Sequence, residues 1–107
     1  MACEDYTLEE LLSLVVSEKA DGIRLCPGEP PCIVVAGESR PLQGPCIGPA
    51  ETDRFLRAVA NTRQMRQFWS EHLLECDFLF QGLHPFWVYA SDDGESIMLE
   101  LQRLEAE

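Results

Sequence analysis

Positively charged residues are scarce in this sequence, and Lys19 is its only lysine. Lysines and arginines together number 8 against 19 aspartates and glutamates, which gives a formal net charge of −11 at pH 7. Because so acidic a surface repels phosphate groups, the composition argues against binding to nucleic acid or to anionic lipid. It favours a partner with a basic protein surface. The alternative is that the surplus acids only keep a small domain soluble.

Long apolar runs are also missing. No run approaches the roughly 20 residues that a helix needs to cross a bilayer. The acidic amino terminus MACEDYTLEE lacks the basic and then apolar segments of a signal peptide. We therefore expect a cytoplasmic protein without membrane insertion. The length of 107 residues predicts a single domain that spans residues 1–107 around one hydrophobic core.

Cysteine pairs at metal-binding or redox spacing do not occur. The five cysteines are Cys3, Cys26, Cys32, Cys46 and Cys76, and they form no C-x-x-C pair. This pattern predicts free thiols in a reducing compartment and no metal site. Cys26 and Cys32 flank the turn PGEPP and could face each other across a hairpin, or they could be buried as small apolar side chains.

The common nucleotide-binding and hydrolase motifs are absent. The chain has no G-x-x-x-x-G-K-[ST], G-x-S-x-G, H-E-x-x-H or G-x-G-x-x-G. His72 and His84 bracket Cys76, but one follows a helix and the other lies in a Gly-Leu-His-Pro turn. We expect both histidines at the surface, and we predict no Cys–His catalytic pair. The sequence thus predicts no catalytic residue, no cofactor and no enzyme activity.

Apolar spacing predicts three helices. Thr7 and Glu10 have the S/T-x-x-E spacing of a capping box, and apolar residues then recur at helical spacing up to about residue 19. Pro49 suits the first turn of a second helix. Thr62 is predicted to cap a third helix, which meets the second near Asn61.

Alternating apolar residues predict five or six strands. Pro41 restricts one of them to a sheet edge, because proline has no N–H for a ladder hydrogen bond. Asp93-Gly94 is a strong hairpin signal between the last two. The order of elements predicts an α+β domain, with three helices packed on one face of a mostly antiparallel sheet. The predicted strands are residues 22–26, 32–36, 40–42, 75–80, 86–91 and 97–102.

The alternation divides the strand side chains between two faces of the sheet. We expect Phe78, Phe80, Phe86, Val88, Leu99 and Leu101 to point to the helices. The residues expected to point away are Arg24, Asp77, Leu79, Trp87, Tyr89, Glu100 and Gln102. This second face then meets water or a partner, which an antiparallel sheet tolerates. Trp87 beside Tyr89 and Leu79 is our candidate for the centre of a partner-binding surface, because aromatic residues are enriched at hot spots; simple solvent exposure is the alternative.

Two segments resemble a known family. The run ADGIRLCPGEPPCIVVAGESRPL resembles the pattern A-S-D-L-H-L-x-x-G-x-P-P-x-x-R-x-x-G-x-x-x-x-L. The segment LLECDFLFQGLHPFWVYASDDGESIMLELQRL is similar to E-x-D-F-S-[YF]-x-x-x-G-x-x-R-F-R-V-N, followed by a variable turn and a strand that ends in R-x-I. These patterns mark the N-terminal domain of PilT-type retraction ATPases of type IV pili and twitching motility. The resemblance runs from about Leu8 to Leu104 and implies a PAS-like α+β fold.

The chain departs from the family pattern at polar and charged positions. In the family this domain precedes a RecA-like domain, and the ATP site lies between the two. Because the sequence stops at Glu107, where that second domain would begin, we expect the nucleotide pocket to be missing. The family's Ser-Asp-x-His positions correspond to Asp21, Gly22 and Arg24. In R-F-R-V-N, an arginine corresponds to Trp87 and the asparagine corresponds to Tyr89. The first arginine of R-x-I corresponds to Gln102.

The resemblance and its departures together predict a non-catalytic adapter or regulator. Its partner would be a motor ATPase, a pilus component or a second copy of itself. The first alternative is an N-terminal fragment of a complete hexameric retraction ATPase. The second is a PAS-like sensor that holds a small ligand among Phe78, Phe80 and Phe86.

Overall fold

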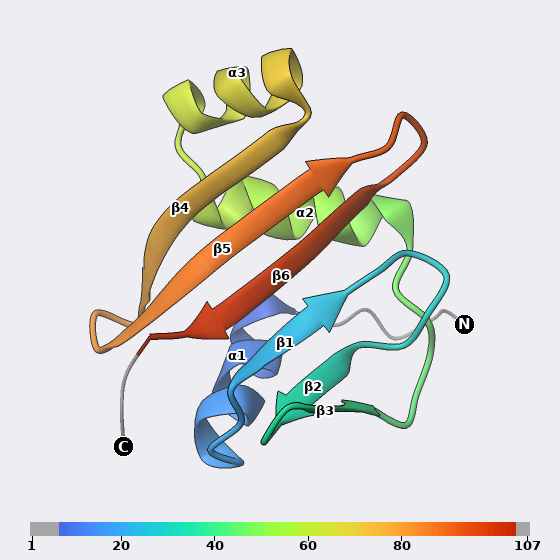
Figure 1. Cartoon of the computed structure of the whole chain (residues 1–107), viewed down its shortest axis with the longest axis vertical. Helices are drawn as coiled ribbons and strands as arrows, with labels where there is room; N and C mark the ends of the chain where they lie inside the picture. Colours follow the sequence, from blue (N-terminus) through green and yellow to red (C-terminus); the bar gives the residue numbers. More distant parts are fainter. Residues whose placement is uncertain (1–6, 105–107) are drawn as a thin grey trace.

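Six antiparallel strands form one open sheet, in the order β3-β2-β1-β6-β5-β4 (Figure 1). The computed structural model describes residues 7–104. The elements are α1 (Leu8–Ser17), β1 (Gly22–Leu25), β2 (Cys32–Val35), β3 (Glu38–Pro41), α2 (Pro49–Val59), α3 (Thr62–Glu71), β4 (Leu73–Phe80), β5 (His84–Asp92) and β6 (Ile97–Arg103). The predicted α+β class is confirmed, and β3 with Pro41 is an edge strand as predicted. The arrangement is compatible with the PAS-like fold that the resemblance implies.

Reciprocal side-chain caps begin the first and third helices. The Thr7 hydroxyl accepts from the Glu10 N–H at 3.1 Å, and the Glu10 carboxylate accepts from the Thr7 N–H at 3.3 Å, which confirms the predicted capping box. The prediction for α3 was wrong by one residue. Asn61 is the N-cap in place of Thr62, and it exchanges two hydrogen bonds of 2.8 Å with Gln64. Gln64 lies three residues after Asn61 and can reciprocate, whereas the corresponding partner of Thr62 would be a methionine.

Side chains from all three helices and from one face of the sheet share a buried core. The helices supply Leu11, Leu12, Val15, Phe55, Leu56, Val59 and Phe68. Of the residues predicted to point to the helices, Phe80, Phe86, Val88, Leu99 and Leu101 are buried, and Phe78 on the edge strand β4 is half-buried against the same core. In Figure 1, α1 and α2 lie behind the sheet and α3 lies beyond the start of β4. The face that is turned to the viewer carries no helix.

None of the described helices is long and apolar enough to cross a membrane. The expectations for the amino-terminal residues before Thr7, and for Cys3 among them, lie outside the described residues.

Candidate protein-binding face

The strand register places the seven predicted binding residues on the helix-free face of the sheet, which we call the open face. Residues that pair directly across antiparallel strands share a face, and the pairs form two rows across the sheet. One row is Asp77, Trp87, Gln102, Gly22, Val34 and Ser39. The other is Glu75, Tyr89, Glu100, Arg24, Cys32 and Pro41. Leu79, paired with Pro85, continues the same face at the end of β4.

An aromatic pair lies on β5, one strand in from the β4 edge of the open face. Trp87 and Tyr89 are two residues apart on β5, so their side chains leave the same side of the strand. Their rings stack with centroids 5.9 Å apart and an angle of 28° between the planes. Both side chains are half-buried. Leu79 on the neighbouring strand β4 is 56% exposed and extends the apolar surface of the same face. The pair therefore presents a rigid apolar surface to solvent.

Carboxylates flank this aromatic pair on both neighbouring strands. Asp77 lies opposite Trp87, while Glu75 and Glu100 lie on either side of Tyr89. Glu75 was missed in the sequence analysis, although its place two residues before Asp77 in the alternating strand could have revealed it. Ion pairs within 4.0 Å join Arg40 to Glu38, Arg57 to Asp53 and His72 to Asp92, and none of these pairs involves an acid of the open face. The acids of the open face thus retain their negative field.

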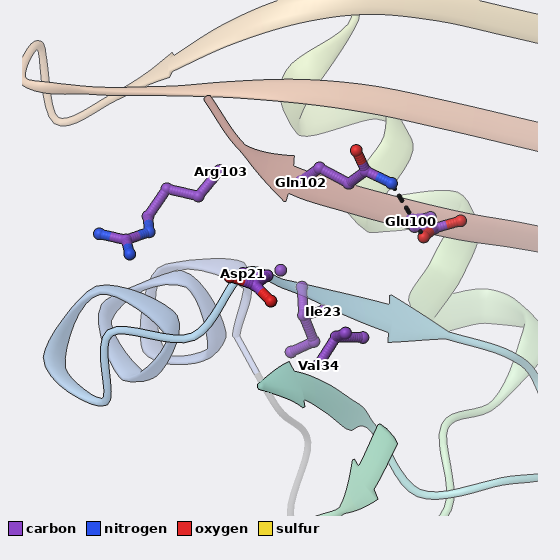
Figure 2. Close-up of a pocket in the computed structure, with 7 residues that line it drawn as sticks. Asp21, Ile23, Val34, Glu100, Gln102 and Arg103 are labelled. Atoms are coloured by element: carbon purple, nitrogen blue, oxygen red, sulfur yellow. Dashed lines mark hydrogen bonds between the residues drawn. The ribbon is translucent and has the colours of Figure 1, made fainter. Parts of the chain in front are cut away.

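A hollow of about 240 Å³ opens above Gly22, one strand away from the aromatic pair. Figure 2 shows the side chains around it, among them Asp21, Val34 and Glu100. Gly22 lies between Gln102 of β6 and Val34 of β2, where it contributes no side chain. A Cβ atom here would lie 2.4 Å from the carbonyl oxygen of Leu101, so the close approach of β6 requires glycine. Sequence reasoning missed this hollow. The lining residues are Asp21, Gly22, Ile23, Val34, Glu100, Gln102 and Arg103.

The cysteines of the described part of the chain are free thiols. Cys26 and Cys32 are half-buried and line a second hollow together with Arg24, Glu29 and Ser39. Burial raises the pKa of the Cys26 thiol, and the nearby Glu29 carboxylate raises it further. Burial also raises the pKa of Cys76, which packs against the core. Thiols with raised pKa values stay protonated at neutral pH and are poor nucleophiles.

The two histidines lie in different surroundings. His72 is exposed at the end of α3, where its Nδ1 lies 3.4 Å from an oxygen of Asp92. His84 begins β5 and is half-buried beside the ring of Phe80. Within residues 7–104, no three His, Cys, Asp or Glu side chains are grouped to hold a metal ion.

Comparison with known proteins relates the chain in sequence to a type IV pilus ATPase. No family model matches the sequence. The chain is 29% identical over 99 residues to the type IV pilus ATPase PilU of Pseudomonas aeruginosa, and the match covers 91% of this chain and 25% of PilU. The chain thus spans a quarter of the length of this curated relative.

Solved structures of ATPases contain the same fold. The crystal structure of the pilus retraction motor PilT with bound ADP matches with a TM-score of 0.85 and 20% identity, over 96% of this chain and 30% of that one. The ATPase DotB of Legionella pneumophila matches with a TM-score of 0.79 and 17% identity, over 95% of this chain and 30% of that one. The ATPase DotB of Yersinia pseudotuberculosis matches with a TM-score of 0.75 and 14% identity, over 94% of this chain and 31% of that one. The predicted resemblance is therefore confirmed: this chain is homologous to part of the type IV pilus ATPase PilU, and it has the fold of about 30% of the PilT and DotB chains.

Proposed function

We propose that this domain is a non-catalytic protein-binding module, an adapter or regulator that acts in the cytoplasm on an ATPase of a type IV pilus or a related secretion system. The relation to PilU and the fold shared with PilT and DotB support this setting. The observation that carries the proposal is the stacked Trp87–Tyr89 pair, which lies between carboxylates on a sheet face without helices.

The open face has the physical features of a binding surface. Trp87 and Tyr89 are large, and stacking and neighbouring strands already restrict their rotamers, so they lose little conformational entropy when a partner covers them. The flanking acids add long-range attraction, which raises the association rate with a basic surface and disfavours an acidic one. Apolar contact at the centre would thus supply affinity, and charge would supply selectivity.

The face offers binding groups in place of reactive ones. Its polar side chains are carboxylates, an amide, a guanidinium, the hydroxyls of Ser39 and Tyr89 and the half-buried thiol of Cys32. Burial raises the pKa of the neighbouring Cys26 thiol. In the family pattern an arginine stands at the position of Trp87. At this position the present chain has a side chain that binds by contact area, which supports a docking role.

The experiment that tests the proposal measures binding of the purified chain to a purified PilU-type ATPase. Trp87→Glu puts a charge into the aromatic pair of the open face, and we expect it to weaken binding by about 30-fold or more, as at an interface hot spot. Trp69→Glu is the matched control, because Trp69 is 45% exposed on α3, away from the open face. We expect this variant to bind within about twofold of wild type.

The same variants are melted to separate binding from folding. The proposal requires the melting temperature of Trp87→Glu to stay close to that of wild type. A variant that unfolds would assign Trp87 to the core. Equal affinity of wild type and Trp87→Glu, or no binding of the ATPase to the wild-type chain, would contradict the proposal.

A second candidate function is that of an N-terminal domain within a complete hexameric retraction ATPase. The shared fold over about 30% of the PilT chain favours it. The open face would then dock against another domain of the same motor. The length of the reading frame distinguishes this candidate from a separate adapter.

The small-ligand sensor is less well supported. The rings of Phe80 and Phe86 pack edge to face with centroids 6.3 Å apart and are both buried. Close packing of this kind fills the region that a ligand would need.

A further inference from the structure

We propose that the hollow above Gly22 receives one arginine side chain of the protein partner. This inference rests on the proposed docking role of the open face and adds the chemistry that the partner must present.

The size of the hollow suits one long side chain. Its volume of about 240 Å³ is below the roughly 300–1,000 Å³ of a typical small-molecule pocket. Its floor is open because Gly22 has no side chain, and Val34 on β2 supplies an apolar wall. A flexible aliphatic stem could lie along this wall while its polar head reaches the rim.

The charges at the rim favour a cation. Asp21 and Glu100 both line the hollow. Glu100 accepts a hydrogen bond of 3.3 Å from Gln102 Nε2, and no ion pair within 4.0 Å joins it to another described residue. A carboxylate accepts several hydrogen bonds, so Glu100 retains capacity for a bound cation.

Two arginines of the chain lie at this site: Arg103 lines the hollow, and Arg24 is paired with Glu100 in the register. Arg103 Nε donates to the carbonyl oxygen of Ala20 at 3.0 Å, and Figure 2 shows its guanidinium extending away from Glu100 and Gln102. Arg24 lies opposite Glu100 in the register, but its side chain lines the second hollow with Glu29. The carboxylates at the first hollow are therefore available to a partner.

The aromatic pair lies one strand away from the hollow, on the other side of β6. Gln102 pairs with Gly22 on one side and with Trp87 on the other, and Glu100 pairs in the same way with Arg24 and Tyr89. The rings do not line the hollow, but they lie on the same face one strand away from it. A partner that covers the aromatic pair can therefore extend a neighbouring side chain into the hollow. Guanidinium groups stack on aromatic rings and bond carboxylates in two parallel contacts, whereas the lysine ammonium is a compact point charge. The carboxylates of the hollow therefore favour an arginine over a lysine of the partner.

Other occupants fit less well. An apolar side chain would bury the two carboxylates without a partner, which is costly. An anion would be repelled by them. A second copy of this chain carries the same net charge of −11, so long-range repulsion opposes self-association on this face. A basic protein surface that presents an arginine fits both the size of the hollow and the negative electrostatic field of the open face.

The test uses blocked tripeptides as probes and the intact chain as receptor. Acetyl-Gly-Arg-Gly-amide is titrated against ¹⁵N-labelled protein and followed by amide chemical shifts. Its citrulline analogue is the matched control, since citrulline has nearly the same shape without the charge. We expect saturable millimolar binding of the arginine peptide, with the largest shifts at Gly22, Glu100 and Gln102. The citrulline peptide should bind at least about tenfold more weakly, because a charge-assisted hydrogen bond is lost.

Two single-charge variants locate the site. Glu100→Gln should weaken binding of the arginine peptide by about tenfold. Asp21→Asn removes the other carboxylate charge at the rim and should also weaken binding. Glu95→Gln removes the same charge in the exposed β5–β6 turn and should leave the affinity unchanged. Equal binding of the arginine and citrulline peptides, or shifts centred away from Gly22, would overturn the inference. That failure is separate from failure of the docking role, which the Trp87→Glu affinity decides.

Discussion

Gly22→Ala is predicted to destabilise the protein at the centre of its sheet. The new Cβ would lie 2.4 Å from the Leu101 oxygen and 3.0 Å from the Gln102 Cα, both of which are backbone atoms, so β1 and β6 must separate locally. Such overpacking costs roughly 1–3 kcal/mol. The lower conformational entropy of alanine in the unfolded chain offsets about 0.4–1 kcal/mol of it. We therefore expect the free energy of unfolding to fall by about 1–2 kcal/mol.

This loss is measurable by urea unfolding and by thermal melting. With an unfolding entropy of about 2.1 cal/mol/K per residue over 107 residues, the melting temperature should fall by roughly 4–9 °C. The denaturant slope should not change, because the variant and the wild type expose nearly the same additional surface when they unfold. Gly48→Ala is the matched control: its Cβ would touch only Glu51 Oε1, at 3.7 Å. We expect it to stay within about 0.5 kcal/mol of wild type. A Gly22→Ala variant as stable as wild type would refute the reasoning.

Three further predictions concern the helix cap and the thiols. Asn61→Ala should lower the free energy of unfolding by about 1 kcal/mol, whereas Thr62→Ala should change it by less than about 0.5 kcal/mol. Urea unfolding measures both values, and a larger loss for Thr62→Ala than for Asn61→Ala would identify Thr62 as the cap. Iodoacetamide at pH 8 should modify exposed Cys46 before Cys26 and Cys76, whose pKa values burial raises, and equal rates by mass spectrometry would contradict that burial. The folded-state pKa values of Cys26 and Cys76 lie above the ordinary value of 9.0, so their contribution to stability is fully present below that pH and is lost as the pH rises through the folded-state values. The free energy of unfolding should accordingly decline above pH 9, and a variant with alanine at both positions should show a shallower decline.

Local signals in the sequence predicted most elements of the fold. Asp93-Gly94 marked the β5–β6 turn, where Asp93 Oδ1 accepts from the N–H groups of Glu95 and Ser96. Alternation predicted which residues face the core, because side chains leave a strand on alternate sides. The pairing of β1 with β6 joins segments far apart in the chain, and periodicity carries no information about such a contact.

Part of the candidate site could likewise be predicted from the sequence, and part could not. Trp87 and Tyr89 lie on one strand, so their common face follows from spacing alone. The hollow depends on Gly22 standing between side chains of two other strands, which only the register reveals. The cap at Asn61 was missed because Thr62 is also a good capping residue; the reciprocal partner Gln64 decides between them.

Site-specific photocrosslinking tests the central claim, that the open face is the docking surface, most directly. Tyr89→p-benzoylphenylalanine places the crosslinker beside Trp87, and Trp69→p-benzoylphenylalanine places it on α3 as the control. Each purified chain is irradiated with a purified PilU-type ATPase. We predict a covalent adduct with the ATPase from position 89 and none from position 69. An adduct from position 69 alone, or equal yields from both positions, would contradict the claim.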